Sequence, residues 1–304
     1  MCPAPVIDAV CMWVDGTRPD YLELVRLYAG TPRDLNPERY RDPFDLLRYS
    51  LRSIELHAPW LRNIYLFTCR PQVPAWLRAD HPRIRVVHHD ETGAPPGMLP
   101  TFNSNVIESL FHRLPGMSEQ FLYLNDDHFL CADTTPLDFL TRDGRIRIFG
   151  TVCGEHFRRR VYHHQIISLG LLEHGPFLID RGEWAAMLQE EAKEVAACQL
   201  HRFRQPDDLR LDRLYRWHML THCREGVVVE PCWRYLRYAI FHKIKPGAEH
   251  QRRALARIAR RRPRFLCLND DLGPHADDAV VQIVREFLDG LFPHPSSFEQ
   301  VSPA

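Results

Sequence analysis

Two Asn-Asp-Asp triplets are the residues of this sequence best suited to bind a metal ion. One occupies residues 125–127 after the apolar run 121–124, and the other occupies residues 269–271 after the apolar run 265–268. Hard divalent cations such as Mg²⁺ or Mn²⁺ prefer oxygen ligands, which usually come from separate segments of the chain. If the two triplets converge in the fold, they could hold such an ion against the phosphates of a nucleotide. The alternative is that each triplet only forms a turn or caps a helix.

Arginines form a second group of residues that could bind a ligand. Arg48 and Arg52 lie four residues apart, so they share one face of a helix. Arg41, Arg202 and Arg204 could lie near them. A planar guanidinium group can hold a diphosphate through two parallel hydrogen bonds. Arginines at this spacing more often form a solvated helix surface, so their distance from the strand ends decides between the two interpretations.

Three other patterns point to structure rather than chemistry. His218 and His222 lie one helical turn apart, as in zinc proteases, but the glutamate that would act as the base is absent, which favours structural or surface histidines. The basic stretch 251–264 could bind RNA or membrane phosphates, but its interspersed Ala, Leu and Ile favour a solvated amphipathic helix. The nine cysteines include no Cys-x-x-Cys pair, which predicts free thiols in a reducing compartment.

The overall composition narrows the class of protein. The chain has 304 residues, 45% of them apolar, which is enough for one large core. Lysine plus arginine and aspartate plus glutamate both total 39, so no net field attracts nucleic acid and we predict no nucleic-acid partner. The sequence has no charged leader and no apolar run of about eighteen residues, the length of a membrane span. We therefore predict a cytoplasmic protein without a transmembrane segment, a prediction that is compatible with peripheral membrane contact.

The apolar periodicity predicts strands that alternate with helices in the first half of the chain. The expected strands are residues 6–14, 63–68, 83–89 and 121–124, and the expected helices are residues 47–58 and 104–114. Parallel strands need crossover connections, so this alternation predicts an α/β fold with a largely parallel sheet and flanking helices. The second half is predicted to be mostly helical, with helices at about 182–197, 206–222 and 278–291.

The ends of the predicted strands bring the candidate residues together. Trp13, Asp15 and Gly16 lie at the carboxyl end of the first strand, and residues 125–127 follow the fourth. Open α/β sheets bind their ligands at the carboxyl ends of the strands. We therefore expect these segments to line one ligand site.

Several longer motifs point to a known family. They are residues 7–16 (IDAVCMWVDG), 39–42 (RYRD), 47–55 (LRYSLRSIE), 99–108 (LPTFNSNVIE), 121–127 (FLYLNDD), 267–270 (CLND) and 292–299 (FPHPSSFE). Together they resemble the four conserved regions of the Stealth family, which includes bacterial capsule polysaccharide phosphotransferases and the catalytic subunit of lysosomal-enzyme N-acetylglucosamine-1-phosphotransferase. The likeness covers nearly the whole chain.

The resemblance implies a Rossmann-like, GT-A-like fold with a divalent metal ion, Mg²⁺ or Mn²⁺. It implies that Asp126 or Asp127 helps to hold this ion, with Asn269 or Asp270 as a second contributor. We expect residues 1–150 to form the nucleotide-sugar-binding core. Residues 151–304 would then complete the same active site within one compact catalytic domain.

The resemblance also implies catalytic and substrate-binding residues. The family's His-x-Pro motif and a later arginine segment match here at His174 and Arg204, which we take as catalytic together with Asp126. The segment from Trp13 through Asp15 to Gly16 would line the nucleotide site. We take four further residues of the matched motifs as substrate-binding, namely Arg48, Arg52, Asn103 and Asn105. The stretch 152–173, which is rich in Arg and His, departs from the family pattern and could accompany a different acceptor.

These inferences combine into one hypothesis. The protein would transfer a hexose-1-phosphate, such as N-acetylhexosamine-1-phosphate from UDP-GlcNAc, to a hydroxyl of a glycan or polysaccharide acceptor, in capsule or exopolysaccharide synthesis. His174 would act as the base, because an imidazole titrates near neutral pH. The closest rival is a metal-dependent glycosyltransferase that attacks the anomeric carbon and releases a nucleoside diphosphate. A non-catalytic phosphate-binding module is a more remote alternative.

Overall fold

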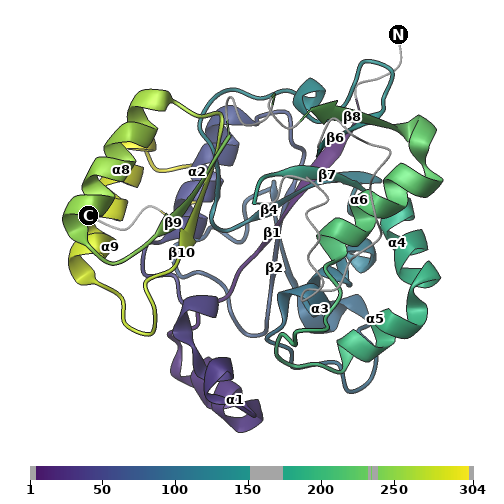
Figure 1. Cartoon of the computed structure of the whole chain (residues 1–304), viewed down its shortest axis with the longest axis horizontal. Helices are drawn as coiled ribbons and strands as arrows, with labels where there is room; N and C mark the ends of the chain where they lie inside the picture. Colours follow the sequence, from purple (N-terminus) through teal and green to yellow (C-terminus); the bar gives the residue numbers. More distant parts are fainter. Residues whose placement is uncertain (1–4, 151–173, 232–233, 235–238, 301–304) are drawn as a thin grey trace.

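The computed structural model describes residues 5–150, 174–231, 234 and 239–300. In this part of the chain, the largest sheet has the strand order β3-β2-β1-β4-β7. Its strands are β3 (Ile84–His88), β2 (Ile64–Thr68), β1 (Ile7–Met12), β4 (Gln120–Asn125) and β7 (Phe177–Asp180). The first four are parallel, and β7 runs antiparallel to β4. The predicted α/β fold with a largely parallel sheet is therefore confirmed (Figure 1).

The central strands are continuous apolar runs because both faces of the sheet are covered. Along β1 and β2 almost every side chain is buried, as parallel strands require. On one side lies α2 (Leu46–His57), whose Leu47, Leu51 and Ile54 belong to the main core. This is the helix that the spacing of these residues predicted.

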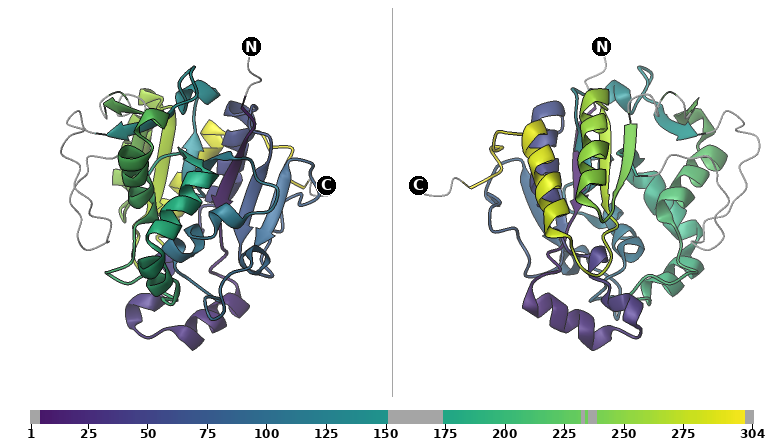
Figure 2. Two further views of the ribbon diagram at one scale, coloured as in Figure 1. Left: turned by 90° about the vertical axis from the view of Figure 1, so that its right-hand side faces the viewer. Right: turned by 60° about the vertical axis from the view of Figure 1, so that its left-hand side comes forward.

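The second half of the chain forms helices and additional strands. Its helices are α4 (Arg181–Glu190), α5 (Ala192–Gln199), α6 (Leu211–His222), α8 (Ala248–Arg261) and α9 (Asp278–Leu291). Figure 2 shows α8 and α9 side by side over the strands β9 (Ala239–Ile244) and β10 (Phe265–Asp270). The basic stretch thus forms an amphipathic helix, as expected. The strands of this half were not predicted, and the helix expected at 182–197 is interrupted at Glu191.

Strands from the two halves of the chain pair with each other. The short strand β5 (His128–Leu130) follows β4 directly and pairs antiparallel with β10, which in turn pairs parallel with β9. A separate two-stranded sheet joins β6 (Ile146–Gly150) to β8 (Val227–Pro231). The proposed division at residue 150 stays a prediction. The Arg- and His-rich stretch 152–173 lies outside the described residues.

Helix α1 (Pro19–Tyr28) extends beyond the carboxyl edge of the main sheet, at the bottom of Figure 1. It follows the turn after β1 and packs through Tyr21 and Val25 on a small cluster that includes Tyr40 and Phe203. At the same edge, α3 (Ser104–Glu108) precedes β4 and is shorter than the helix expected at 104–114. These elements surround the strand ends at which the sequence placed a ligand site.

Candidate active site at the carboxyl edge of the sheet

The two Asn-Asp-Asp triplets meet, as the sequence analysis required. β5 carries the first triplet to β10, and the register pairs Cys267 with His128. The backbone N–H of Leu268 donates a 3.0 Å hydrogen bond to the carbonyl oxygen of Asp127. The thiol of Cys267 lies 3.3 Å from Oδ2 of Asp127. The first triplet therefore lies beside the strand that carries the second, which is the condition for a shared cation site.

Three carboxyl groups from two segments crowd together at this point. Burial, followed by the charges of Asp127 and Asp42, raises the pKa of Asp126 well above its usual range. Burial likewise raises the pKa of Asp42 to about 6, although this carboxylate accepts the backbone N–H of Leu46 at the start of α2. Each shift shows that the ionised form is costly here. A bound cation would remove that cost.

The donor atoms fit a hard divalent cation such as Mg²⁺ or Mn²⁺. Oδ1 of Asp127 is buried and makes no hydrogen bond to the described residues, and Nε2 of His128 lies 3.6 Å from it, so this oxygen is a candidate ligand. The softer neighbours are less suitable. Burial, with the Asp127 charge next, raises the pKa of the Cys267 thiol well above its usual value, and Nδ1 of His128 accepts the N–H of Asn125 at 3.2 Å. Because burial also lowers the pKa of His128, its neutral ring carries the proton on Nε2. We therefore assign any cation at this centre to carboxylate oxygens.

The second triplet contributes less than we predicted. Successive strand residues point to opposite faces, so Asn269 shares the face of Cys267 and Asp270 lies on the other face. Asp270 forms a bidentate ion pair with Arg41 at 2.7 and 3.1 Å, and the two side chains are only 8% and 7% exposed. Its charge is already neutralised. We retain Asn269 as a candidate ligand and leave Asp270 out of the proposed metal set.

His174 lies next to the acidic triplet. His174 comes three residues before β7, the strand that pairs with β4. Burial lowers the pKa of His128, and the charge of His174 lowers it further, so the two imidazoles are close. The His174 ring stacks on Phe241 with 4.2 Å between ring centroids. His174 is exposed and has a left-handed backbone, with φ of 58°.

Glu108 is a site residue that sequence reasoning missed. The Tyr123 hydroxyl lies 3.0 Å from Oε1 of Glu108 and 2.7 Å from Oδ1 of Asn125, so it links Glu108 to the first triplet. Burial and the nearby Asp212 raise the pKa of Glu108 to about 7, and Arg204 opposes this increase. Arg204 therefore lies beside a carboxyl group that titrates near neutral pH. The signal was available, because Glu108 ends the motif 99–108.

The two asparagines of that motif have different environments. Both polar atoms of the Asn103 side chain form hydrogen bonds. Its Oδ1 accepts the N–H of Asn105 at 3.1 Å, and its Nδ2 donates to Asp208 at 2.6 Å. It caps α3 and ties that helix to the segment before α6. Nδ2 of Asn105 is buried and has no hydrogen-bond partner among the described residues. Asn105 is therefore the better candidate for substrate binding.

The segment after β1 is shaped by backbone contacts. Gln72 clamps Asp15 by accepting its N–H at 2.6 Å and donating to its carbonyl oxygen at 3.1 Å. A Cβ on Gly16 would lie 2.3 Å from the Tyr40 carbonyl oxygen, so only glycine fits. Trp13 continues from β1 through its N–H to the Phe67 carbonyl oxygen at 3.2 Å. This rigid turn stands at the edge where we predicted the nucleotide.

A cavity of about 490 Å³ opens beside this turn. Its walls come from α1, from the ends of β2 and β3, and from the start of the motif 99–108. The lining residues include Tyr21, Leu24, Gln72, Asp90 and Phe102. The combination of aromatic walls and a few polar groups is typical of a small-molecule site.

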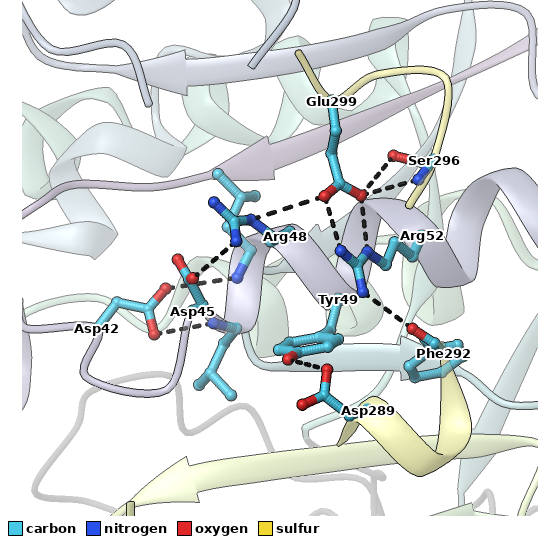
Figure 3. A network of polar contacts seen from close by, with 11 residues as sticks. Asp42, Asp45, Arg48, Tyr49, Arg52, Asp289, Phe292, Ser296 and Glu299 are labelled. Atoms are coloured by element: carbon cyan, nitrogen blue, oxygen red, sulfur yellow. Dashed lines mark hydrogen bonds and ion pairs between the residues drawn. The ribbon is translucent and has the colours of Figure 1, made fainter. Parts of the chain in front are cut away.

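Arg48 and Arg52 serve a different purpose from the one we predicted (Figure 3). The guanidinium group of Arg52 makes two 2.7 Å hydrogen bonds to Glu299 and a 3.0 Å bond to the Phe292 carbonyl oxygen. Arg48 lies 3.3 Å from Asp45 and 3.8 Å from Glu299. Both arginines thus fasten the last described segment to α2. We do not include them in the proposed substrate site.

Two conserved-region models of the Stealth protein family match the chain. Conserved region 2 matches residues 39–148, and conserved region 4 matches residues 256–304. An exopolysaccharide phosphotransferase of Streptomyces coelicolor is 35% identical over 319 residues, an alignment that covers 97% of this chain and 51% of that protein. This chain therefore spans about half the length of that relative.

A human relative and a solved structure are also similar to the chain. The human N-acetylglucosamine-1-phosphotransferase subunits alpha/beta are 44% identical over 118 residues, which cover 39% of this chain and 9% of that protein. Among solved structures, the galactosyltransferase LgtC is similar with 14% identity and a TM-score of 0.44, over 96% of this chain and 98% of LgtC. Within the described residues, none of the helices has the length and apolar character that crossing a membrane requires.

Proposed function

This chain belongs to the Stealth family, and on that premise we propose that it is a phosphotransferase for polysaccharide synthesis. It moves a hexose-1-phosphate from a nucleotide sugar to a hydroxyl group of a glycan. The product is a phosphodiester, and the leaving group is a nucleoside monophosphate. The names of the similar bacterial and human phosphotransferases support this choice.

One observation carries the proposal. The carboxyl groups of Asp42, Asp126 and Asp127 are crowded at the carboxyl edge of the sheet, and burial and mutual repulsion raise the pKa of Asp126. Oδ1 of Asp127 is buried and makes no hydrogen bond to the described residues. The arrangement is unfavourable without a cation and favourable with one. When bound, Mg²⁺ or Mn²⁺ would neutralise the diphosphate of the donor.

The residues around this centre supply the other functions. His174 accepts the proton of the acceptor hydroxyl, whose oxygen forms a bond to the β-phosphorus of the donor. The bond between that phosphorus and the bridging oxygen breaks, and the anomeric C–O bond stays intact. Arg204, held beside Glu108, contacts the phosphate oxygens. Such positioning and charge stabilisation account for most of the catalysis in phosphoryl transfer.

The nucleoside part of the donor occupies the cavity of about 490 Å³ next to the Trp13–Gly16 turn. Asn105, with its free buried Nδ2, contacts the sugar phosphate. UDP-GlcNAc is the first donor to examine. We place the reaction in the cytoplasm, because the six described cysteines are free thiols, as in a reducing compartment.

The nature of the released nucleotide tests the proposal. The full chain is incubated with a set of nucleotide sugars, Mg²⁺ and candidate glycan acceptors, and the products are separated by anion-exchange chromatography. We expect a nucleoside monophosphate from one donor. Release of a nucleoside diphosphate instead would identify a glycosyltransferase and contradict the proposal. The matched control is Asp271→Asn, which changes an exposed member of the second triplet and should retain activity.

A further inference from the structure

A second group of metal-ligating side chains lies between α4 and α6, outside the carboxylate centre. At its middle is His218, which is only 6% exposed. Its Nε2 lies 3.1 Å from Oε2 of Glu183, and its Nδ1 lies 3.2 Å from Oε2 of Glu190. The thiol of Cys223, just after the end of α6, lies 2.9 Å from the same Glu183 oxygen.

This geometry needs a positive charge. A neutral imidazole has one N–H, so it can donate to only one of the two carboxylates. Its other nitrogen would then direct a lone pair at a carboxylate oxygen, which is repulsive in a buried position. Either the ring of His218 is a buried imidazolium, or a cation lies between one nitrogen and its carboxylate.

The Nε2 side has the ligands of a zinc site. Nε2 of His218, Sγ of Cys223 and a Glu183 oxygen all lie within 4.8 Å of one another, and the sulfur lies 4.0 Å from Nε2. Zinc bonds of about 2.0–2.3 Å in a tetrahedron place ligand atoms roughly 3.3–3.7 Å apart. The three atoms therefore need to move by only a few tenths of an ångström to surround an ion.

The Nδ1 side has the partner that a zinc-bound histidine normally has. A histidine ligand usually donates its other ring N–H to a carboxylate, which fixes the orientation of the ring. Glu190 is placed to accept this proton from His218, and His222 lies 3.3 Å from the same Glu190 oxygen. The two glutamates lie seven residues apart on α4, and they contact the two ring nitrogens of His218, one each.

We propose that Glu183, His218 and Cys223 bind a zinc ion that fastens α6 to α4, with Glu190 as the residue that orients His218. Binding displaces the thiol proton to solvent and forms a zinc–thiolate bond. A fourth position is left for water.

Metal titration of the full chain tests the site. The protein is stripped with a chelator, dialysed and titrated with Co²⁺, whose thiolate complexes absorb in the near ultraviolet, and then with Zn²⁺ in competition with a chelating dye. We expect one thiolate-bound Co²⁺ per chain, displaced by Zn²⁺. We also expect added Zn²⁺ to raise the melting temperature.

Variants separate this site from the other thiols and from the carboxylate centre. Cys223→Ser should lose the thiolate absorption and bind Zn²⁺ about 100-fold more weakly, and Glu190→Gln about 10–100-fold more weakly. Cys198→Ser and Asp127→Asn should keep the signal. Wild-type affinity in Cys223→Ser, or loss of the signal in Cys198→Ser instead, would overturn the proposal. If Cys223→Ser does not fold, Glu183→Gln decides in the same way.

The absence of thiolate-bound Co²⁺ in the wild-type protein would also overturn the proposal. His218 would then be an imidazolium held by two glutamates. None of these outcomes depends on the transfer reaction, so a failure here leaves the proposed function untouched.

Discussion

Two carboxylate-rich regions of this molecule have opposite electrostatic character. We call the contacts of Arg48 and Arg52 on α2 with Glu299 the clasp. Burial alone would raise the pKa of Glu299 in the clasp, but hydrogen bonds from Arg52 and Ser296 hold this pKa below its usual value. At the strand ends, burial and neighbouring carboxylates raise the pKa of Asp126 well above its usual range. In the clasp the charge of Glu299 is balanced by Arg52, whereas the carboxylates at the strand ends need a cation to balance them.

The contrast separates structural from functional charges. A buried carboxylate with a bidentate arginine holds segments together, as Asp270 does with Arg41. A buried carboxylate whose neighbours are also acidic costs stability, and that cost is typical of functional sites. Variants in the two regions should therefore have opposite effects on activity and stability.

The largest effect is expected from Asp127→Asn at the strand ends. Removing this ligand should lower the rate of transfer by about 10³-fold or more, because metal-assisted charge stabilisation is worth several kcal/mol. The metal-free variant should be at least as stable as the wild type, because a repulsive charge is gone. Steady-state kinetics and thermal unfolding in a chelator measure the two quantities. A large loss of stability would place Asp127 with the structural carboxylates.

The second largest effect is expected from His174→Gln. General-base catalysis contributes about 10²–10⁴-fold, so turnover should fall by at least about 10²-fold. The Michaelis constant for the donor should change little, because this exposed side chain acts on the acceptor hydroxyl. Wild-type turnover in this variant would remove His174 from the mechanism.

The clasp should respond in the opposite way. Arg52→Gln leaves Glu299 buried without its bidentate partner, which we expect to lower the free energy of unfolding by about 1–3 kcal/mol. Turnover and the Michaelis constant of the folded fraction should stay close to the wild-type values. Chemical denaturation and kinetics of the same preparation check both. A selective rise in the donor Michaelis constant would instead favour the original prediction that Arg52 binds the diphosphate.

The smallest effect concerns the pH dependence of stability. The pKa of Glu108 is raised from 4.5 to about 7, so between these values the folded state binds more protons than the unfolded state does. This carboxyl group therefore lowers the stability as the pH rises through that window. Glu108→Gln should flatten this part of the stability profile, whereas Glu286→Gln, at an exposed position of α9, should not. Identical profiles for wild type and Glu108→Gln would contradict the assignment.

The sequence predicted the parts of the site that depend on local pattern. The apolar run 121–124 predicted that residues 125–127 follow a strand, and they lie at the end of β4. The strand β10 before Asp271 was not predicted, although it pairs with β5. Asp15 and Gly16 were expected after the first strand, and they do follow β1. The helix α2 followed from its apolar spacing.

The ion-pair partners of the charged residues could not be predicted from the sequence. Arg52 and Glu299 are 247 positions apart, and only tertiary packing decides that their charges meet each other rather than a ligand. The same holds for Asp270, which looked like a ligand until its ion pair with Arg41 was known. Glu108 ends the motif 99–108, which marked it as a candidate, but its raised pKa depends on burial and on Asp212 and so needed the tertiary structure.

Binding of Mn²⁺ at neutral pH tests the central claim most directly. Electron paramagnetic resonance counts free and bound Mn²⁺ in the wild type, in Asp127→Asn and in Arg52→Gln. We predict that the wild type and Arg52→Gln bind Mn²⁺ with affinities equal within a few-fold, and that Asp127→Asn loses this binding. Wild-type affinity in Asp127→Asn would contradict the account.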